Sequence, residues 1–163
     1  MKTLYLVRHA KSDRTMDLAD IDRPLNIRGY RDAHSMSSLM REKKFLPDVI
    51  ISSPAIRAIT TALIFCRNFK LDPTDIIIDH NLYETDVKQY MSVIAQTNDQ
   101  FNSIMLFAHN PTISDLANSL TKPFSDTMPT CGIVGITTNC KLWNDFGSTT
   151  GALKLYDYPK NNI

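Results

Sequence analysis

The sequence has little of several features that mark specialised proteins. It contains three cysteines, Cys66, Cys131 and Cys140, whose odd number and wide spacing fit a reduced intracellular protein better than a disulfide framework or a zinc site. Eighteen Lys and Arg against seventeen Asp and Glu leave a net charge of +1, which provides no general attraction for nucleic acid or an anionic membrane. Any bound anion must therefore be held by a local cluster of side chains.

Long hydrophobic runs are also lacking. No apolar run approaches the roughly 18 residues of a membrane-spanning helix. Lys2 precedes an apolar stretch at the N-terminus, but Arg8 ends that stretch before it could form the hydrophobic region of a signal peptide. These absences predict a soluble, cytoplasmic protein. The 163 residues, 43% of them hydrophobic, suit a single domain over residues 1–163 with a sizeable core, and we expect a monomer.

Short strand-like runs alternate with longer segments of helical period along the chain. The predicted strands are residues 4–7, 48–52, 76–79, 104–108, 132–137 and 152–156. Apolar stripes with helical spacing occupy residues 33–40, 56–63, 87–94 and 113–120. The alternation predicts an α/β fold with three αβα layers and a mainly parallel central sheet flanked by helices. Because the strand-like runs are continuously apolar, we expect strands covered on both faces.

Two local patterns predict boundaries between these elements. Ser53 and Pro54 are typical of a helix start, with the serine as N-cap and the proline at the first helical position. Residues 123–132 contain three Pro or Gly among polar side chains and predict a loop.

Charged side chains follow several predicted strands where those strands end. Arg8 and His9 end the first strand, Arg57 lies in the first turn of the helix after the second, and Glu84 and His109 follow the third and fourth. The carboxyl ends of parallel strands and the helix N-termini beside them form the usual ligand crevice of such sheets. We therefore expect two histidines, two arginines and a carboxylate at one rim, which is the composition of a phosphate pocket with a nucleophile.

Each of these residues alone also fits a structural role. A lone histidine is more often a hydrogen-bonded structural group than a catalyst. His34 lies within a helical segment and His80 only precedes a possible acid, so we interpret both as structural. For the two arginines and two histidines at the strand ends, the structural interpretation is weaker, because several strands would have to carry them to one edge by chance.

A set of motifs in these regions resembles the histidine phosphatase superfamily. The motifs are residues 6–12 (LVRHAKS), 22–25, 28–29, 52–58, 61–62, 82–84, 108–111, 129–132, 143 and 151–153. They span nearly the whole chain in the family's order, with Ala10 where glycine is usual. Within the superfamily the chain is most similar to the short SixA-like phosphohistidine phosphatases, through its size, its RHAKS and RPL elements and its His-Asn-Pro motif. The resemblance implies a phosphoglycerate mutase-like fold.

The resemblance also implies a role for each site residue. His9 would attack phosphorus through a neutral ring nitrogen and form a covalent phosphohistidine that water hydrolyses. Arg8 and Arg57 would hold phosphoryl oxygens through their guanidinium forks, His109 would donate to the same oxygens, and Arg23 would be an additional phosphate-binding arginine. A backbone carbonyl should set the tautomer of His9, and neighbouring arginines should lower its pKa. Neither a metal nor another cofactor is expected.

Some residues near the site keep two interpretations. Glu84 matches a general acid that protonates the leaving group in many superfamily members, but a plain surface carboxylate is an equal alternative, because imidazole leaves more easily than an alkoxide. Asn110 either shapes the pocket or caps the helix starting near Pro111. Lys11 and Ser12 fit a rim contact and a helix-starting hydroxyl, and neither is predicted to be catalytic. Arg14 stands where many SixA-like proteins have tryptophan.

The stretch between Glu84 and His109 holds little more than one helix and one strand, so no large insertion covers the predicted pocket. A shallow pocket should admit a phosphorylated side chain of another protein. The leading hypothesis is a phosphatase for protein phosphohistidine, acting on phosphorelay or phosphotransfer proteins in signal transduction. The alternative among enzymes is a small-molecule phosphomonoesterase or a phosphoglycerate mutase-type enzyme. A non-catalytic phosphate-recognition module is a less favoured alternative, since binding alone needs no nucleophile, and a purely structural domain is the last.

Overall fold

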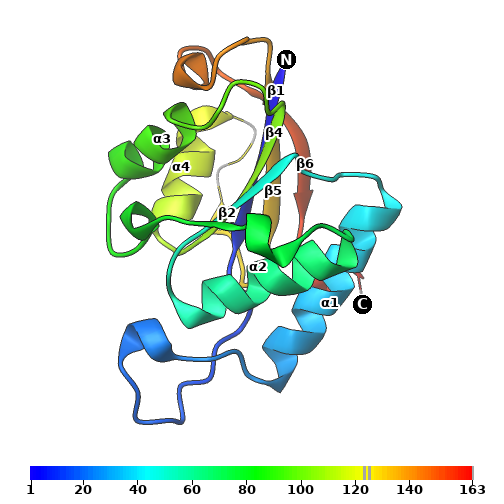
Figure 1. Ribbon diagram of the computed structural model, residues 1–163, viewed down its shortest axis with the longest axis vertical. Coiled ribbons are helices and arrows are strands. Elements are labelled where there is room, and N and C mark those ends of the chain that lie inside the picture. The colour runs from blue at the N-terminus through cyan, green and yellow to red at the C-terminus, as the bar shows by residue number, and fades with distance from the viewer. Residues whose placement is uncertain (123, 125, 163) are drawn as a thin grey trace.

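A twisted central sheet runs through the molecule, with helices on both of its sides (Figure 1). The computed structural model describes residues 1–122, 124 and 126–162. The strands are β1 (Lys2–Arg8), β2 (Val49–Ser52), β3 (Ile77–Ile78), β4 (Ser103–Ala108), β5 (Ile133–Thr138) and β6 (Ala152–Asp157). They are ordered β3-β2-β4-β1-β5-β6 across the sheet.

The strands nearest the predicted site are parallel. β3, β2, β4 and β1 run in one direction, and β5 is antiparallel to both β1 and β6. The sheet is therefore mainly parallel, as predicted. Arg8 pairs with Ala108 and Ser52 pairs with Phe107, so the ends of β1, β2 and β4 reach the same edge of the sheet. This register brings the residues that follow these three strands close together.

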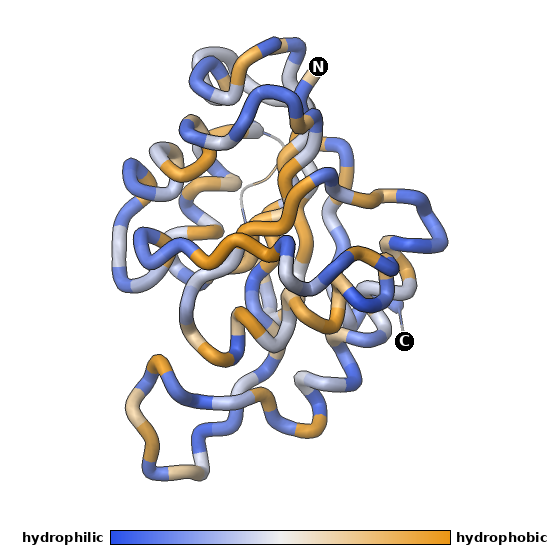
Figure 2. Tube along the Cα trace, in the orientation of Figure 1, coloured by the Kyte–Doolittle hydropathy of each residue, from blue (hydrophilic) through white to orange (hydrophobic). Residues whose placement is uncertain are grey.

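The four α-helices form the two outer layers. They are α1 (Ile27–Glu42), α2 (Ile56–Asn68), α3 (Val87–Ala95) and α4 (Thr112–Leu120). Because side chains of a strand alternate between faces, Leu4 and Leu6 pack in a core cluster with α3 and α4, whereas Tyr5 and Val7 pack with α1 and α2. The hydrophobic colouring in Figure 2 follows the central strands accordingly. The three-layer αβα architecture is confirmed.

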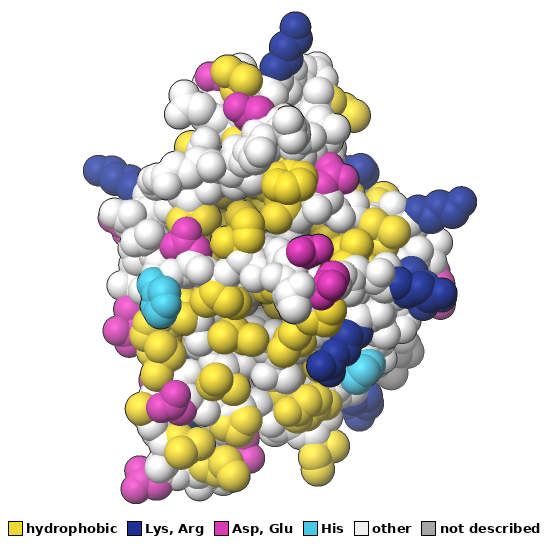
Figure 3. All heavy atoms as spheres, in the orientation of Figure 1, with side chains coloured by type: hydrophobic (Ala, Val, Ile, Leu, Met, Phe, Trp, Pro, Cys, Tyr) yellow, Lys and Arg dark blue, Asp and Glu magenta, His cyan; other side chains and the backbone are white. Residues whose placement is uncertain are grey.

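Short 3₁₀ turns and loops complete the described chain. The turns are Asp20–Asp22 (η1), Pro73–Asp75 (η2), His80–Leu82 (η3), Trp143–Asp145 (η4) and Pro159–Asn162 (η5). All three cysteines are free thiols. In the described part of the chain, no helix is both long enough and apolar enough to cross a membrane. On the face drawn in Figure 3, basic and acidic side chains are scattered between hydrophobic ones, which matches the balanced charge of the sequence.

Several sequence-based expectations differ from this structure. Helix α2 begins at Ile56 with Ala55 as its N-cap and without a side-chain cap, so the prediction that Ser53 caps it is wrong. The expectation of strands covered on both faces is wrong for β3, where Ile77 is 47% exposed, because β3 is an edge strand with two residues. The predicted loop begins at Pro123, which lies outside the described residues; Thr127–Pro129 carry no helix or strand.

Candidate active site

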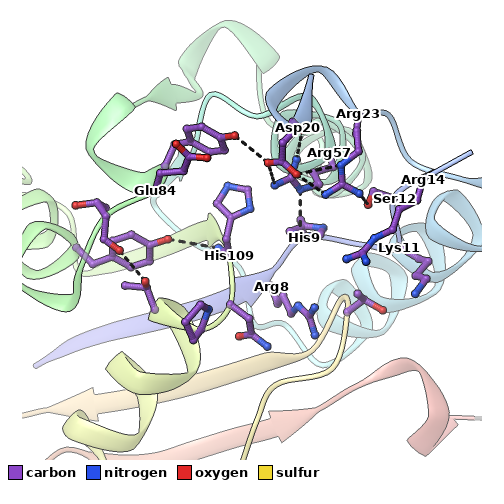
Figure 4. Close-up of a pocket in the computed structure, with 17 residues that line it drawn as sticks. Arg8, His9, Lys11, Ser12, Arg14, Asp20, Arg23, Arg57, Glu84 and His109 are labelled. Atoms are coloured by element: carbon purple, nitrogen blue, oxygen red, sulfur yellow. Dashed lines mark hydrogen bonds and ion pairs between the residues drawn. The ribbon is translucent and has the colours of Figure 1, made fainter. Parts of the chain in front are cut away.

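The predicted site residues line a single cavity at the edge of the sheet where β1, β2 and β4 end (Figure 4). Its volume is about 560 Å³. Its walls include all six predicted residues, Arg8, His9, Arg23, Arg57, Glu84 and His109. His34 lies exposed on α1 and His80 lies exposed in η3, and neither lines this cavity. The parallel register of the strands thus collects residues that are as far apart in sequence as Arg8 and His109.

His9 follows β1 directly and is only 7% exposed. Its Nδ1 lies 2.7 Å from the carbonyl oxygen of Ala10. Because a carbonyl only accepts, Nδ1 carries the ring hydrogen of the neutral imidazole, and Nε2 presents its lone pair. Burial lowers the pKa of His9 to about 3, against the effect of the Ala10 bond, and the positive charges of His109, Arg57 and Arg8 lower it further. At neutral pH His9 is therefore an uncharged base whose lone pair is on Nε2.

His109 follows β4 and faces His9, with 5.2 Å between the ring centroids. Its Nε2 lies 2.6 Å from Ser53 Oγ at the end of β2, so a buried hydroxyl from the neighbouring strand orients the ring. Burial, followed by the charge of Arg57, lowers the pKa of His109 to about 4. The Ser53 hydroxyl, which the sequence predicts to be a helix cap, thus contacts His109 after the neighbouring strand. Sequence spacing alone does not reveal this contact.

Arg8 ends β1 beside His9 and points into the cavity (Figure 4). Its Nη1 donates to the Met128 carbonyl at 2.9 Å. Its buried Nε has no hydrogen-bond partner among the described residues. Burial and then the charge of Arg14 lower the pKa of Arg8 from its usual value. A half-buried guanidinium with a buried, unused donor is suited to bind an oxyanion entering the cavity.

Arg57, in the first turn of α2, is 5% exposed and makes the contact nearest to the reacting atom. Its Nε donates to His9 Nε2 at 3.3 Å. Its Nη2 donates to Asp20 Oδ2 at 2.8 Å, and its Nη1 donates to the backbone carbonyl of Asp20. Every nitrogen of this guanidinium therefore has a partner in the cavity wall.

Arg23 lies in the same wall and is held by two residues. Its Nη1 donates to Ser12 Oγ at 2.8 Å, and its Nη2 and Nε donate to Asp20 Oδ1 at 2.7 and 3.0 Å. Ser12 forms an isolated β-bridge with Leu25, so the expectation of a helix-starting hydroxyl is wrong. Its hydroxyl is instead an acceptor for a cavity arginine.

Asp20 is a cavity residue that sequence reasoning missed. Its carboxylate accepts from Arg23, Arg57 and the hydroxyl of Tyr83, the last at 2.8 Å. Partial burial raises its pKa, but the hydrogen bonds from Tyr83, Arg23 and Arg57 outweigh this effect and hold the pKa well below its usual range. Asp20 does not follow a strand, and the available signal was its place three residues before Arg23.

Glu84 follows η3 and lines the cavity near Tyr83. Its backbone φ is 50°, in the left-handed region that residues with a Cβ adopt infrequently. Burial, then Asp20, and then Glu84 raise the pKa of Tyr83 to about 12. The Tyr83 ring packs edge-on against His109, with 5.6 Å between centroids. Glu84 thus lies beside residues that surround the reacting centre, and its role as acid is still a prediction.

Asn110 shapes the cavity wall, which was one of its two interpretations. Helix α4 begins at Thr112 with Pro111 as N-cap and no side-chain cap, so the other interpretation is wrong. Asn110 Nδ2 donates to the Met128 carbonyl at 2.9 Å, and its Oδ1 accepts from Ser114 Oγ at 2.6 Å. The same carbonyl accepts from Arg8, so Asn110 braces the backbone that anchors a cavity arginine.

The cavity is rich in positive charge. Its cationic lining residues are Arg8, Lys11, Arg14, Arg23 and Arg57, and its acids are Asp20 and Glu84. Within the described ranges, no group of three or more His, Cys, Asp or Glu is arranged to hold a metal ion. An excess of fixed positive charge with buried arginine donors favours a doubly charged anion such as a phosphoryl group.

Comparison with known proteins gives the class of this protein. Residues 4–111 match the histidine phosphatase superfamily (branch 1), and the chain belongs to this superfamily. No curated protein sequence matches the chain. The resemblance seen in the sequence motifs is therefore confirmed at the level of the superfamily.

Solved structures refine the comparison. A protein assigned as the phosphohistidine phosphatase SixA of Agrobacterium tumefaciens is 26% identical, with a TM-score of 0.82 over 97% of this chain and 98% of that chain. The protein histidine phosphatase SixA complexed with tungstate is 21% identical, with a TM-score of 0.81 over 99% of both chains. A mycobacterial glucosyl-3-phosphoglycerate phosphatase is 14% identical, with a TM-score of 0.71 over 97% of this chain and 98% of that chain. The fold is phosphoglycerate mutase-like, as predicted.

Proposed function

We propose that this member of the histidine phosphatase superfamily removes phosphate from phosphohistidine on other proteins, using His9 as the nucleophile. The observation that carries the proposal is the state of His9. Its Nδ1 hydrogen is committed to the Ala10 carbonyl, and its Nε2 lone pair lies in a cavity with Arg8, Arg57 and His109. A neutral imidazole beside several cationic donors is suited to attack a phosphoryl group and to hold it.

The proposed reaction has two transfers of the same phosphoryl group. His9 Nε2 forms a bond to phosphorus as the bond from phosphorus to the substrate's imidazole nitrogen breaks, and that nitrogen takes up a proton. Water then attacks phosphorus, the bond to Nε2 breaks, and inorganic phosphate leaves. Arg57 Nε donates to Nε2 in the resting site, so it lies beside the transferred group once that lone pair forms the new bond. Arg8 and His109 would stabilise the remaining phosphoryl oxygens.

The substrate class is supported by what surrounds the cavity. Only α3 and β4 lie between Glu84 and His109 in the chain, so this stretch carries no additional domain over the cavity. An uncovered site can receive a side chain that projects from another protein. The similarity to proteins assigned as SixA phosphohistidine phosphatases points the same way. We further propose that the protein is a cytoplasmic monomer and that its reaction needs no metal.

The decisive experiment compares substrates. A histidine-phosphorylated phosphotransfer domain and a panel of sugar phosphates are offered to the enzyme, and kcat/KM is measured for each. We expect the phosphoprotein to be cleaved faster by at least about tenfold, together with an acid-labile, base-stable phosphate on the enzyme that His9→Ala abolishes. Faster cleavage of a sugar phosphate would identify a small-molecule phosphatase instead, and normal turnover by His9→Ala would refute the nucleophile. Activity that a chelator removes would contradict the metal-free mechanism.

A further inference from the structure

The carboxylate of Asp20 lies in the wall of a cationic cavity, where its negative charge opposes the binding of an anion. Its Oδ1 accepts from two nitrogens of Arg23, and its Oδ2 accepts from Arg57 and Tyr83. Its backbone carbonyl accepts a further bond from Arg57. Figure 4 shows Asp20 between the two arginine side chains, above His9. Arg23 and Arg57, two of the three arginines that are predicted to bind phosphate, thus share one carboxylate.

Asp20 is carried by a surface segment whose two ends are tied to each other. Ser12 forms a bridge with Leu25, and the Asp13 amide donates to the Pro24 carbonyl at 2.8 Å. The chain between these ties lies outside the sheet, and the side chain of Asp20 is 49% exposed. The contact with Arg23 lies within this segment, and the contacts with Arg57 connect the segment to the buried part of the site.

The contacts with Asp20 determine how Arg57 points. A guanidinium is planar, so the directions of its donors are coupled. With Nη1 and Nη2 both bound to Asp20, the remaining donor Nε is directed at His9 Nε2, the atom that would receive the phosphoryl group. Of these two bonds only the one from Nη2 depends on the carboxylate, and an Arg57 without it would be held by the backbone carbonyl alone and could turn about that contact and lose that direction.

The same contacts argue against a proton-donating role for Asp20. Three side-chain donors surround the carboxylate and stabilise its charged form, so it carries no proton at neutral pH. A fixed negative charge close to the phosphoryl site also repels an incoming anion. Asp20 is therefore unfavourable for the binding of free phosphate, and this disadvantage must be outweighed by a contribution to the reacting geometry.

We propose that Asp20 is a positioning residue, which orients the guanidinium groups of Arg57 and Arg23 for phosphoryl transfer and at the same time weakens the binding of free phosphate. The proposal rests on the phosphatase function proposed above. It predicts opposite effects on two measurements, because loss of the carboxylate disorders the arginine forks but also removes a repulsive charge. Structural damage alone would weaken both catalysis and binding.

The test uses Asp20→Ala and Asp20→Asn, with Asp22→Asn as the matched control. Asp22 lies in the same turn, and no hydrogen bond or ion pair joins its side chain to another described residue. For Asp20→Ala we expect kcat to fall about 10- to 100-fold, since small errors in orientation are costly, while inorganic phosphate binds severalfold more tightly. Asp20→Asn should lie between wild type and Asp20→Ala, and Asp22→Asn should match wild type.

Two phosphomonoesters separate positioning from proton donation. 4-Nitrophenyl phosphate has a good leaving group and an alkyl phosphate has a poor one, and a positioning residue should give the same loss of kcat for both. A loss confined to the alkyl phosphate would show a proton donor and overturn the proposal, as would weaker phosphate binding in both Asp20 variants. If the wild-type protein cleaves neither a histidine-phosphorylated domain nor these two phosphomonoesters, the proposed function fails, and tighter phosphate binding by calorimetry still tests the role of the Asp20 charge.

Discussion

The cavity has two kinds of wall, and they are built differently. On one side, Arg8, His9 and His109 stand at the ends of β1 and β4, where the backbone register of the sheet sets their positions. On the other side, Asp20, Arg23, Tyr83 and Glu84 come from surface segments, where Asp20 is bonded to Arg23 and to Tyr83, and Glu84 follows Tyr83 in the chain. We call these the strand wall (Arg8, His9 and His109) and the loop wall (Asp20, Arg23, Tyr83 and Glu84).

The difference between the walls indicates which residues control the chemical step and which control orientation and substrate choice. Residues of the strand wall are buried or half-buried, and their contacts are with the main chain or with buried hydroxyls: Ala10 for His9, Met128 for Arg8 and Ser53 for His109. Residues of the loop wall contact charged side chains, and such contacts near the surface are weaker and more easily exchanged. The strand wall should therefore control the rate of chemistry, and the loop wall should control orientation and substrate choice.

The largest effect is expected for the strand wall itself. Arg8→Lys keeps the positive charge but removes the planar fork and the buried Nε, which has no partner among the residues that the structure describes. We expect kcat to fall about 10²- to 10³-fold, the range found when one donor to a transition-state oxyanion is lost. Steady-state kinetics with a histidine-phosphorylated domain measure the loss. Arg28→Lys, on the surface of α1, is the matched control, and an equal loss there would contradict a site-specific role for Arg8.

A smaller effect is expected where the strand wall is supported from β2. Ser53→Ala removes the hydroxyl that contacts His109 Nε2, and we expect kcat to fall about 3- to 10-fold, in line with one hydrogen bond. Ser37→Ala removes another buried hydroxyl, in α1 and outside the cavity. Both variants should lose some thermal stability, but only Ser53→Ala should lose activity. Unchanged kcat in Ser53→Ala would show that His109 needs no support from β2.

The loop wall should show an effect that depends on the leaving group. For Glu84→Gln we expect less than about a threefold loss with phosphohistidine, whose imidazole leaves readily, and about 10- to 100-fold with an alkyl phosphate. Parallel kinetics on both substrates check this difference. A large loss with phosphohistidine would assign Glu84 to the main reaction, and no loss with either substrate would reduce it to a surface carboxylate.

The last prediction concerns the free energy of unfolding and its dependence on pH. His9 and His109 should leave it unchanged at neutral pH and should lower it increasingly in acid. The pKa values of His9 and His109, lowered to about 3 and about 4, are below the ordinary value of 6.5 in an unfolded chain. At a pH between the folded and the unfolded pKa values, the unfolded state binds more protons than the folded state. The contribution of these histidines to the free energy of unfolding should therefore be fully present above pH 6.5 and should be lost as the pH drops toward 3. Urea unfolding from pH 8 to 4 measures the slope, and His9→Ala should reduce it. An unchanged slope would contradict the low pKa.

Sequence reasoning performed differently for the two walls. All three residues of the strand wall were predicted, because a residue directly after a buried strand has a position that the strand itself determines. In the loop wall, Glu84 was predicted from its place after the third strand-like run and Arg23 from the family motifs, but no role was predicted for Asp20 or Tyr83. Their importance comes from contacts across the fold, such as the bond from the Tyr83 hydroxyl to Asp20, and no local pattern encodes such a contact.

Ser53 is a second case in which a local sequence pattern did not reveal a contact across the fold. The Ser-Pro pair favours a helix cap, and this local preference lost to a tertiary contact with His109 on the neighbouring strand. The edge strand β3 differed from expectation for a related reason, since an apolar run cannot indicate whether a helix will cover both of its faces. Local preferences are worth little energy each, so packing overrides them where the two conflict.

The sequence by itself determined the alternation of strands and helices, and with it the parallel edge at which Arg8, His9, Arg57 and His109 would meet. It could do so because apolar periodicity and strand ends are properties of short segments. Only the tertiary structure decided that the Ala10 carbonyl sets the tautomer of His9, that Ser53 orients His109, and that Asp20 joins two arginines. The first depends on the backbone conformation directly after β1, and the other two depend on distances of about 3 Å between side chains of different segments, which exist only in the folded chain.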